Sequence, residues 1–118
     1  ACAALLALGL AVPSAQAHHA FGKVFLERVL TLNGTIEEFR WTQPHGWVLL
    51  DVQNPDASTS SWSIETAPPT VLSRRGWGPR SLMRGQRVTL TIHPWRDGGL
   101  GGALIKAALP DGRVLSSE

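Results

Sequence analysis

Four histidines carry most of the chemistry that the sequence allows: His18, His19, His45 and His93. The first two directly follow an Ala-Gln-Ala pattern at residues 15–17, which is typical of a signal-peptidase cleavage site. Cleavage there would make His18 the mature N-terminus, whose free α-amine and imidazole can chelate one metal ion together. Because imidazole is a common transition-metal ligand and nitrogen donors favour copper, copper is the first metal that we expect.

The other histidines are candidates for completing such a site. His45 lies in a predicted turn, and His93 lies near the end of a predicted strand. His19 offers a further route, through the α-amine and the intervening amide nitrogen. The alternatives are a solvated terminus at His18 and His19, a His45 that bonds the backbone of its turn, and a His93 that caps its strand. No rule of sequence spacing brings His45 and His93 together.

An apolar run at residues 3–12, closed by Pro13, precedes the predicted cleavage site. Such a run is typical of a secretory signal. We therefore expect residues 1–17 to be removed and the mature protein to be periplasmic or secreted. The only cysteine, Cys2, falls in this segment, so we expect no disulfide in the mature chain. Residues 18–118 suffice for one domain and contain no apolar run long enough for stable membrane insertion.

Strand and turn patterns predict the elements that must position these residues. Alternating apolar residues and turn residues predict strands, and a Pro-Pro pair followed by Gly76 predicts one short helix. The expected order is strands at 30–41, 47–53 and 62–65, a helix from Pro68-Pro69 to Arg75, strands at 88–93 and 103–109, and a short final strand. The first strand changes its apolar phase at Glu37-Glu38, which predicts a bulge.

This order of three strands, a helix and two strands is that of the OB-fold, a small Greek-key β-barrel that binds ligands on one face. We therefore predict an all-β, OB-fold-like antiparallel barrel with one short helix. The same strands also allow a small β-sandwich. Fold alone does not give function.

Several motifs are spread along the predicted mature chain. They are His18-His19-Ala20-Phe21, Leu32-x-Gly34-Thr35-Ile36-x-x-Phe39-x-Trp41-Thr42-x-Pro44-His45-x-Trp47, Arg75-Gly76-Trp77, Leu82-x-x-Gly85-x-x-Val88-Thr89 and His93-Pro94-x-Arg96-Asp97-Gly98. Together they resemble the DUF6152 family of exported bacterial proteins of unknown function. The resemblance implies an exported protein with a single domain, and it implies no particular activity.

Five tryptophans support a second hypothesis. Trp41, Trp47 and Trp95 lie in the same motifs as two of the histidines, and OB-folds use exposed aromatic rings with arginines, here Arg96, as stacking surfaces. The chain would then be a non-enzymatic module whose groove binds a sugar, a cell-wall fragment or an apolar molecule. Because tryptophan is mostly buried in proteins, Trp62 and Trp47 are better candidates for the core.

Composition and missing motifs disfavour other classes. The formal net charge of only +2 and the predicted export argue against nucleic-acid binding. Five arginines between residues 74 and 87 fit an anionic partner or an ordinary solvated surface. The predicted mature chain has no cysteine nucleophile and no G-x-S-x-G motif, so we predict no catalytic residues. We expect a protein that binds a metal ion or another small ligand. A binding protein is favoured over an enzyme, and the alternative is a copper redox enzyme whose metal ion is bound by His18.

Overall fold

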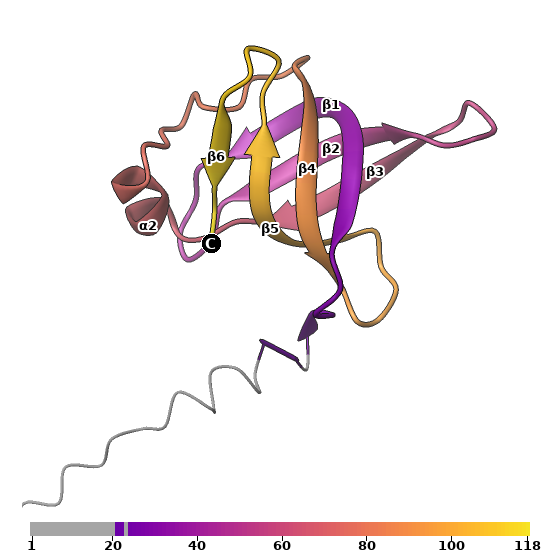
Figure 1. Cartoon of the computed structure of the whole chain (residues 1–118), viewed down its shortest axis with the longest axis horizontal. Helices are drawn as coiled ribbons and strands as arrows, with labels where there is room; N and C mark the ends of the chain where they lie inside the picture. The colour runs from indigo at the N-terminus through magenta and orange to yellow at the C-terminus, as the bar shows by residue number, and fades with distance from the viewer. Residues whose placement is uncertain (1–20, 23) are drawn as a thin grey trace, which may run out of the picture.

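The computed structural model describes Phe21, Gly22 and residues 24–118. The predicted signal segment, His18 and His19 lie outside these residues. The described part folds into one sheet of strands with a short helix (Figure 1): β1 (Leu30–Arg40), β2 (Trp47–Gln53), β3 (Thr59–Glu65), α2 (Pro69–Arg74), β4 (Arg87–Pro94), β5 (Gly101–Ala108) and β6 (Val114–Ser116). No helix within it is long and apolar enough to cross a membrane.

Strand pairing closes the sheet into a barrel. β1 pairs antiparallel with β2 and β4, β2 pairs with β3, and β4 pairs with β5. A parallel pairing of residues 63–65 on β3 with residues 101–103 on β5 completes the circle. The result is the five-stranded barrel of the OB-fold, to which β6 adds a strand along the rest of β5. The predicted fold class is therefore confirmed, and closure excludes the sandwich.

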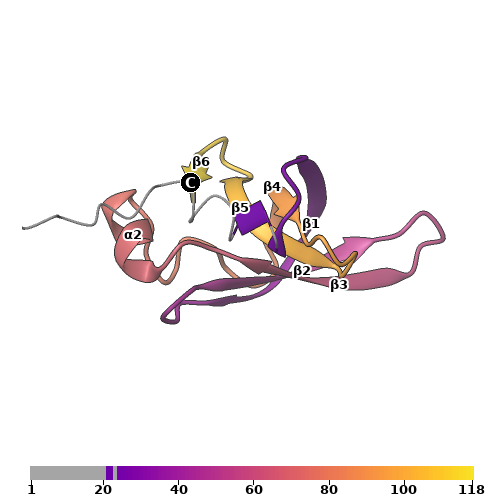
Figure 2. The same ribbon diagram turned by 90° about the horizontal axis from the view of Figure 1, so that it is seen from below.

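The long strand β1 can pair on both sides because it bends. Its first half lies beside β4 up to Thr35, and its second half lies beside β2 from Thr35 onward. The register with β2 shifts between Ile36 and Glu38, which leaves Glu37 as the extra residue of a bulge. The predicted bulge is confirmed. Figure 1 shows β1 arching across the barrel, and Figure 2 shows the β2–β3 hairpin projecting beyond it.

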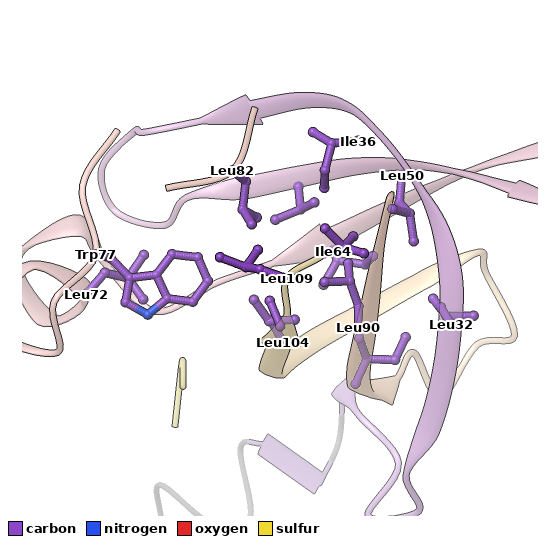
Figure 3. Close-up of a cluster of buried hydrophobic side chains, with 14 residues drawn as sticks. Leu32, Ile36, Leu50, Ile64, Leu72, Trp77, Leu82, Leu90, Leu104 and Leu109 are labelled. Carbon is purple, nitrogen blue, oxygen red and sulfur yellow. The ribbon is translucent and has the colours of Figure 1, made fainter. Parts of the chain in front are cut away.

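Apolar side chains alternate along the strands and meet in one core (Figure 3). The strands contribute Leu32, Ile36, Val48, Leu50, Ile64, Val88, Leu90, Ile92, Leu104 and Ala107. Because side chains along a strand alternate between its two faces, the residues between these core positions point outward. His93 follows buried Ile92 in β4, and it leaves the core face as the alternation predicts.

Helix α2 and the segment after it close the core at one end (Figure 3). The helix begins at Pro69, and Gly76 follows its end with a φ of +87°, as the sequence predicts. Leu72 and Trp77 from this region are buried in the core. The Trp77 indole Nε1–H donates a hydrogen bond of 2.8 Å to the carbonyl of Ser116, which ties the helical region to β6.

Replacing Trp77 by phenylalanine is expected to lower the free energy of unfolding by about 2 kcal/mol, because the smaller ring leaves a space and the Ser116 carbonyl loses its donor. Urea denaturation followed by circular dichroism measures the change. Trp62→Phe is the control, since Trp62 is only partly buried at the edge of the core. We expect it to cost less than half as much, and equal losses would contradict the role assigned to Trp77.

Candidate functional site

A pocket of about 610 Å³ lies beside β5. Its lining combines apolar and aromatic side chains with one imidazole and two carboxylate groups. Its lining consists of Phe21, Phe25, His45, Glu65, Thr66, Ala67, Ala103, Leu104, Ser117 and Glu118. An apolar hollow with a few polar groups is the usual form of a small-ligand site.

The pocket exists because two different strands share one edge of β5. β3 pairs with its first three residues, and β6 pairs with residues 106–108. The chain that leaves β3 and the chain that leaves β6 approach each other along this edge, and Ser117 connects them. Its amide donates to the Ile105 carbonyl at 2.8 Å, and its Oγ accepts from the Ala67 amide at 2.9 Å. The pocket opens beside this seam.

His45 lies in the β1–β2 loop, and both of its ring nitrogens face oxygen atoms. Nδ1 is 3.0 Å from the main-chain carbonyl of Thr66, and Nε2 is 3.2 Å from Oε1 of Glu65. The hydroxyl of Thr42 also donates to the main-chain carbonyl of His45 at 2.8 Å. The imidazole is therefore held in one orientation at the rim of the pocket.

His93, in β4, has the same kind of surroundings as His45. Its Nδ1 is 3.3 Å from the main-chain carbonyl of Arg28, and its Nε2 is 3.0 Å from Oε1 of Glu118. The ring of Phe21 packs edge-on against this imidazole, with 5.4 Å between ring centroids. His93 is thus linked to the pocket through two residues that line it, Phe21 and Glu118.

The barrel closure places the two histidine–glutamate pairs on one surface. His93 on β4 pairs with Ala103 on β5, and Ala103 pairs with Glu65 on β3. Residues paired across strands point to the same side of a sheet, so all three face outward. Two strand spacings separate the backbones of Glu65 and His93 by about 10 Å. Ala103, which lies on the strand between them, carries only a methyl group.

The orientation of the two imidazoles decides which of their atoms could bind a metal ion. When Nδ1–H donates to a main-chain carbonyl, the lone pair of a neutral imidazole is on Nε2, which is how proteins commonly orient metal-binding histidines. In His45 and in His93, Nε2 lies at hydrogen-bond distance from a carboxylate oxygen. That contact needs a proton on Nε2, and a bound metal ion would take the place of this proton. Each pair therefore offers one nitrogen and one oxygen donor. Among the residues that the structure describes, no group of three or more histidine, cysteine or acidic side chains could hold a metal ion.

The predicted tryptophan groove is only partly assembled. Trp95 stacks on Phe25 at 4.7 Å, and together with Arg96 it lines a separate hollow of about 390 Å³. Trp41 instead packs against Phe39 at the edge of the core. Trp47 begins β2, and neither Trp41 nor Trp47 lines this hollow.

Sequence reasoning missed several residues of the site: Phe21, Phe25, Glu65 and Glu118. Alternation with buried Ile64 indicates that Glu65 points outward, so a signal for it was present. No comparable signal exists for Glu118, whose contact with His93 joins positions that are 25 residues apart. The predictions for His18 and His19 concern residues outside the described part of the chain.

Fold and site together define a small OB-type barrel with a ligand-sized pocket flanked by two histidine–carboxylate pairs. A family model, described as DUF6152, a family of unknown function, matches residues 6–104. The chain belongs to this family. No curated protein and no solved structure matches the chain.

Proposed function

We propose that this protein is an exported binding protein for a divalent transition metal ion, copper first, with a site completed by the mature N-terminus. In the proposed site His18 supplies its α-amine and a ring nitrogen. His93 supplies Nε2, and Glu118 supplies a carboxylate oxygen. Four such donors fit the tetragonal geometry of Cu(II), and the predominance of nitrogen favours copper over the other divalent metals.

The observation that carries the proposal is the environment of His93. Its ring is oriented by the Arg28 carbonyl, faces a carboxylate, and is contacted by Phe21. Phe21 follows His18 by three residues, and each residue spans at most about 3.6 Å, so the backbones of His18 and Phe21 lie within about 11 Å of each other. The covalent chain therefore allows the terminal histidine to reach the His93–Glu118 pair.

Removal of the His93 imidazole tests the site. In a protein prepared to begin at His18, we expect His93→Ala to weaken Cu(II) binding by about 100-fold. The substitution removes one nitrogen ligand, and the Glu118 carboxylate loses the imidazole that orients it. Isothermal titration calorimetry against a competing chelator measures the affinity, and electron paramagnetic resonance reports the number of nitrogen ligands.

His45→Ala is the matched control for this experiment. It removes an imidazole that has the same kind of partners but lies in the β1–β2 loop beside Glu65, and we expect it to change the Cu(II) affinity by less than about threefold. A larger loss with His45→Ala than with His93→Ala would move the site to the His45–Glu65 pair. Absence of Cu(II) binding by the unsubstituted protein would overturn the proposed function.

A second candidate function is supported by the hollow that Val24, Trp95, Arg96 and Asp97 line. An indole ring beside a guanidinium group suits a small sugar or an apolar molecule with an anionic group. Such a ligand would change tryptophan fluorescence in the His93→Ala variant as strongly as in the unsubstituted protein. That result, without tight Cu(II) binding, would favour this candidate.

A further inference from the structure

One segment of the chain outside the pocket carries five of the 11 lysine and arginine residues of the protein. Five arginines lie between residues 74 and 87, a region that we call the arginine segment: Arg74, Arg75, Arg80, Arg84 and Arg87. All five residues are exposed. No aspartate or glutamate occurs from residue 66 to residue 96. Because the whole chain carries only +2, the rest of it is net acidic, and the charge is segregated.

The arginine segment runs from the end of α2 to the start of β4, along one side of the barrel (Figure 1). Within the described part of the chain, none of its five guanidinium groups takes part in a hydrogen bond or ion pair. By contrast, Arg40 bonds Glu38, Arg96 bonds the Gly22 carbonyl, and Arg113 bonds Asp111. The donors of the arginine segment are thus free to bind an external anion.

The acidic residue Glu38 on β1 does not compensate this charge. Its pKa is lowered chiefly by its hydrogen bond with Arg40 and to a smaller extent by the charge of Arg84. The carboxylate is 3.0 Å from the Arg40 guanidinium. Glu38 therefore already has a cationic partner outside the arginine segment.

One exposed apolar side chain accompanies the arginines. Met83, which lies directly before Arg84, is 42% exposed. Planar guanidinium groups bind phosphate oxygens in a bidentate manner, and an apolar side chain among basic residues suits the boundary between lipid headgroups and acyl chains. Nucleic acid would use the positive charge but would leave Met83 without an apolar environment. The combination of features favours a lipid surface.

We propose that the arginine segment docks the protein on an anionic phospholipid surface. The guanidinium groups bind lipid phosphates, and Met83 enters the outer part of the acyl region. The contact is peripheral, because Trp77 and Leu82 of this segment are buried in the core and only its exposed side chains can meet the lipid. It is independent of the metal site, and either proposal can fail without the other.

Vesicle sedimentation tests the docking with the full mature chain. The unsubstituted protein is expected to bind vesicles of equal parts phosphatidylglycerol and phosphatidylcholine, and to bind pure phosphatidylcholine vesicles at least about tenfold more weakly. Replacing Arg74, Arg80 and Arg84 together by glutamine is expected to weaken binding to the anionic vesicles by about 100-fold. High salt is expected to weaken it as well.

The matched control replaces Arg28, Lys106 and Arg113 by glutamine, which changes the net charge equally but leaves the arginine segment intact. We expect this variant to bind anionic vesicles within about threefold of the unsubstituted protein, and circular dichroism confirms that both variants are folded. Met83→Gln is expected to weaken binding a further few-fold. Equal losses in the two triple variants, equal binding to both kinds of vesicle, or preference for a soluble nucleic acid over the anionic vesicles would each overturn the proposal.

Discussion

A protein that begins at His18 is expected to bind Cu(II) at least about 100-fold more tightly than the same protein with four extra residues, Gly-Ser-Gly-Ser, before His18. The extension converts the α-amine of His18 into an amide, and its length keeps the new α-amine from forming a terminal chelate with His18 or His19 in second or third place. His93 and Glu118 would then have to hold the ion with the His18 ring alone. Calorimetry gives the affinities, and the electron paramagnetic resonance spectrum is expected to lose one nitrogen ligand.

Enzymatic removal of the four-residue extension is the control for this prediction, because it returns the terminus to His18 and should restore the affinity. N-terminal sequencing of the exported protein is expected to start at His18. Equal affinities of the extended and unextended proteins would exclude the α-amine as a ligand. In that case copper binding, if retained, would depend on side chains alone.

The features that could be predicted from the sequence are those that neighbouring residues determine. The phase change at Glu37-Glu38 identified the bulge in β1, and the pair Pro68-Pro69 identified the start of α2. Alternation from Val88 onward placed His93 outside the core. In each case the pattern lies within one element, so no knowledge of the rest of the chain was required.

The surroundings of the histidines depend instead on long-range pairing. The Nδ1 partner of His45 is the carbonyl of Thr66, 21 residues away, and the Nε2 partner of His93 is Glu118, 25 residues away. The first contact follows from the β2–β3 pairing, which sets Trp47 opposite Glu65, and the second from the path of the chain that leaves β6 along β5. A pattern of apolar residues gives the orientation of each strand but not its neighbours in the barrel, and so the site residues could be proposed only as separate histidines.

The start of β5 is the clearest difference between expectation and structure. The alternation pattern predicts a strand that begins at residue 103, but Gly101 and Gly102 already belong to β5. Their missing side chains allow neighbouring backbones to come unusually close. A Cβ on Gly101 would lie 2.0 Å from the Ser63 carbonyl oxygen, and one on Gly102 would lie 2.0 Å from the His93 carbonyl oxygen. These glycines therefore act in strand pairing rather than in loop flexibility.

Gly102→Ala is accordingly expected to lower the free energy of unfolding by about 3 kcal/mol and the melting temperature by about 15 °C. The added methyl group would meet backbone atoms of His93 and Pro94, which cannot rotate away as a side chain can. Gly102 pairs with Pro94 on one side and Ile64 on the other. The substitution thus separates strands at the point where β3, β5 and β4 close the barrel.

Gly78→Ala is the matched control, because no atom lies within 4 Å of a Cβ built there. We expect it to change the free energy of unfolding by less than about 0.5 kcal/mol. Thermal and urea denaturation of the two variants measure the difference, and comparable stabilities would show that the close approach at Gly102 is not required for closure.

Because the same closure aligns Glu65, Ala103 and His93, Gly102→Ala should also weaken Cu(II) binding at temperatures where the variant is still folded. A destabilised barrel with unchanged Cu(II) affinity would mean that the metal site forms without the register between β4 and β5.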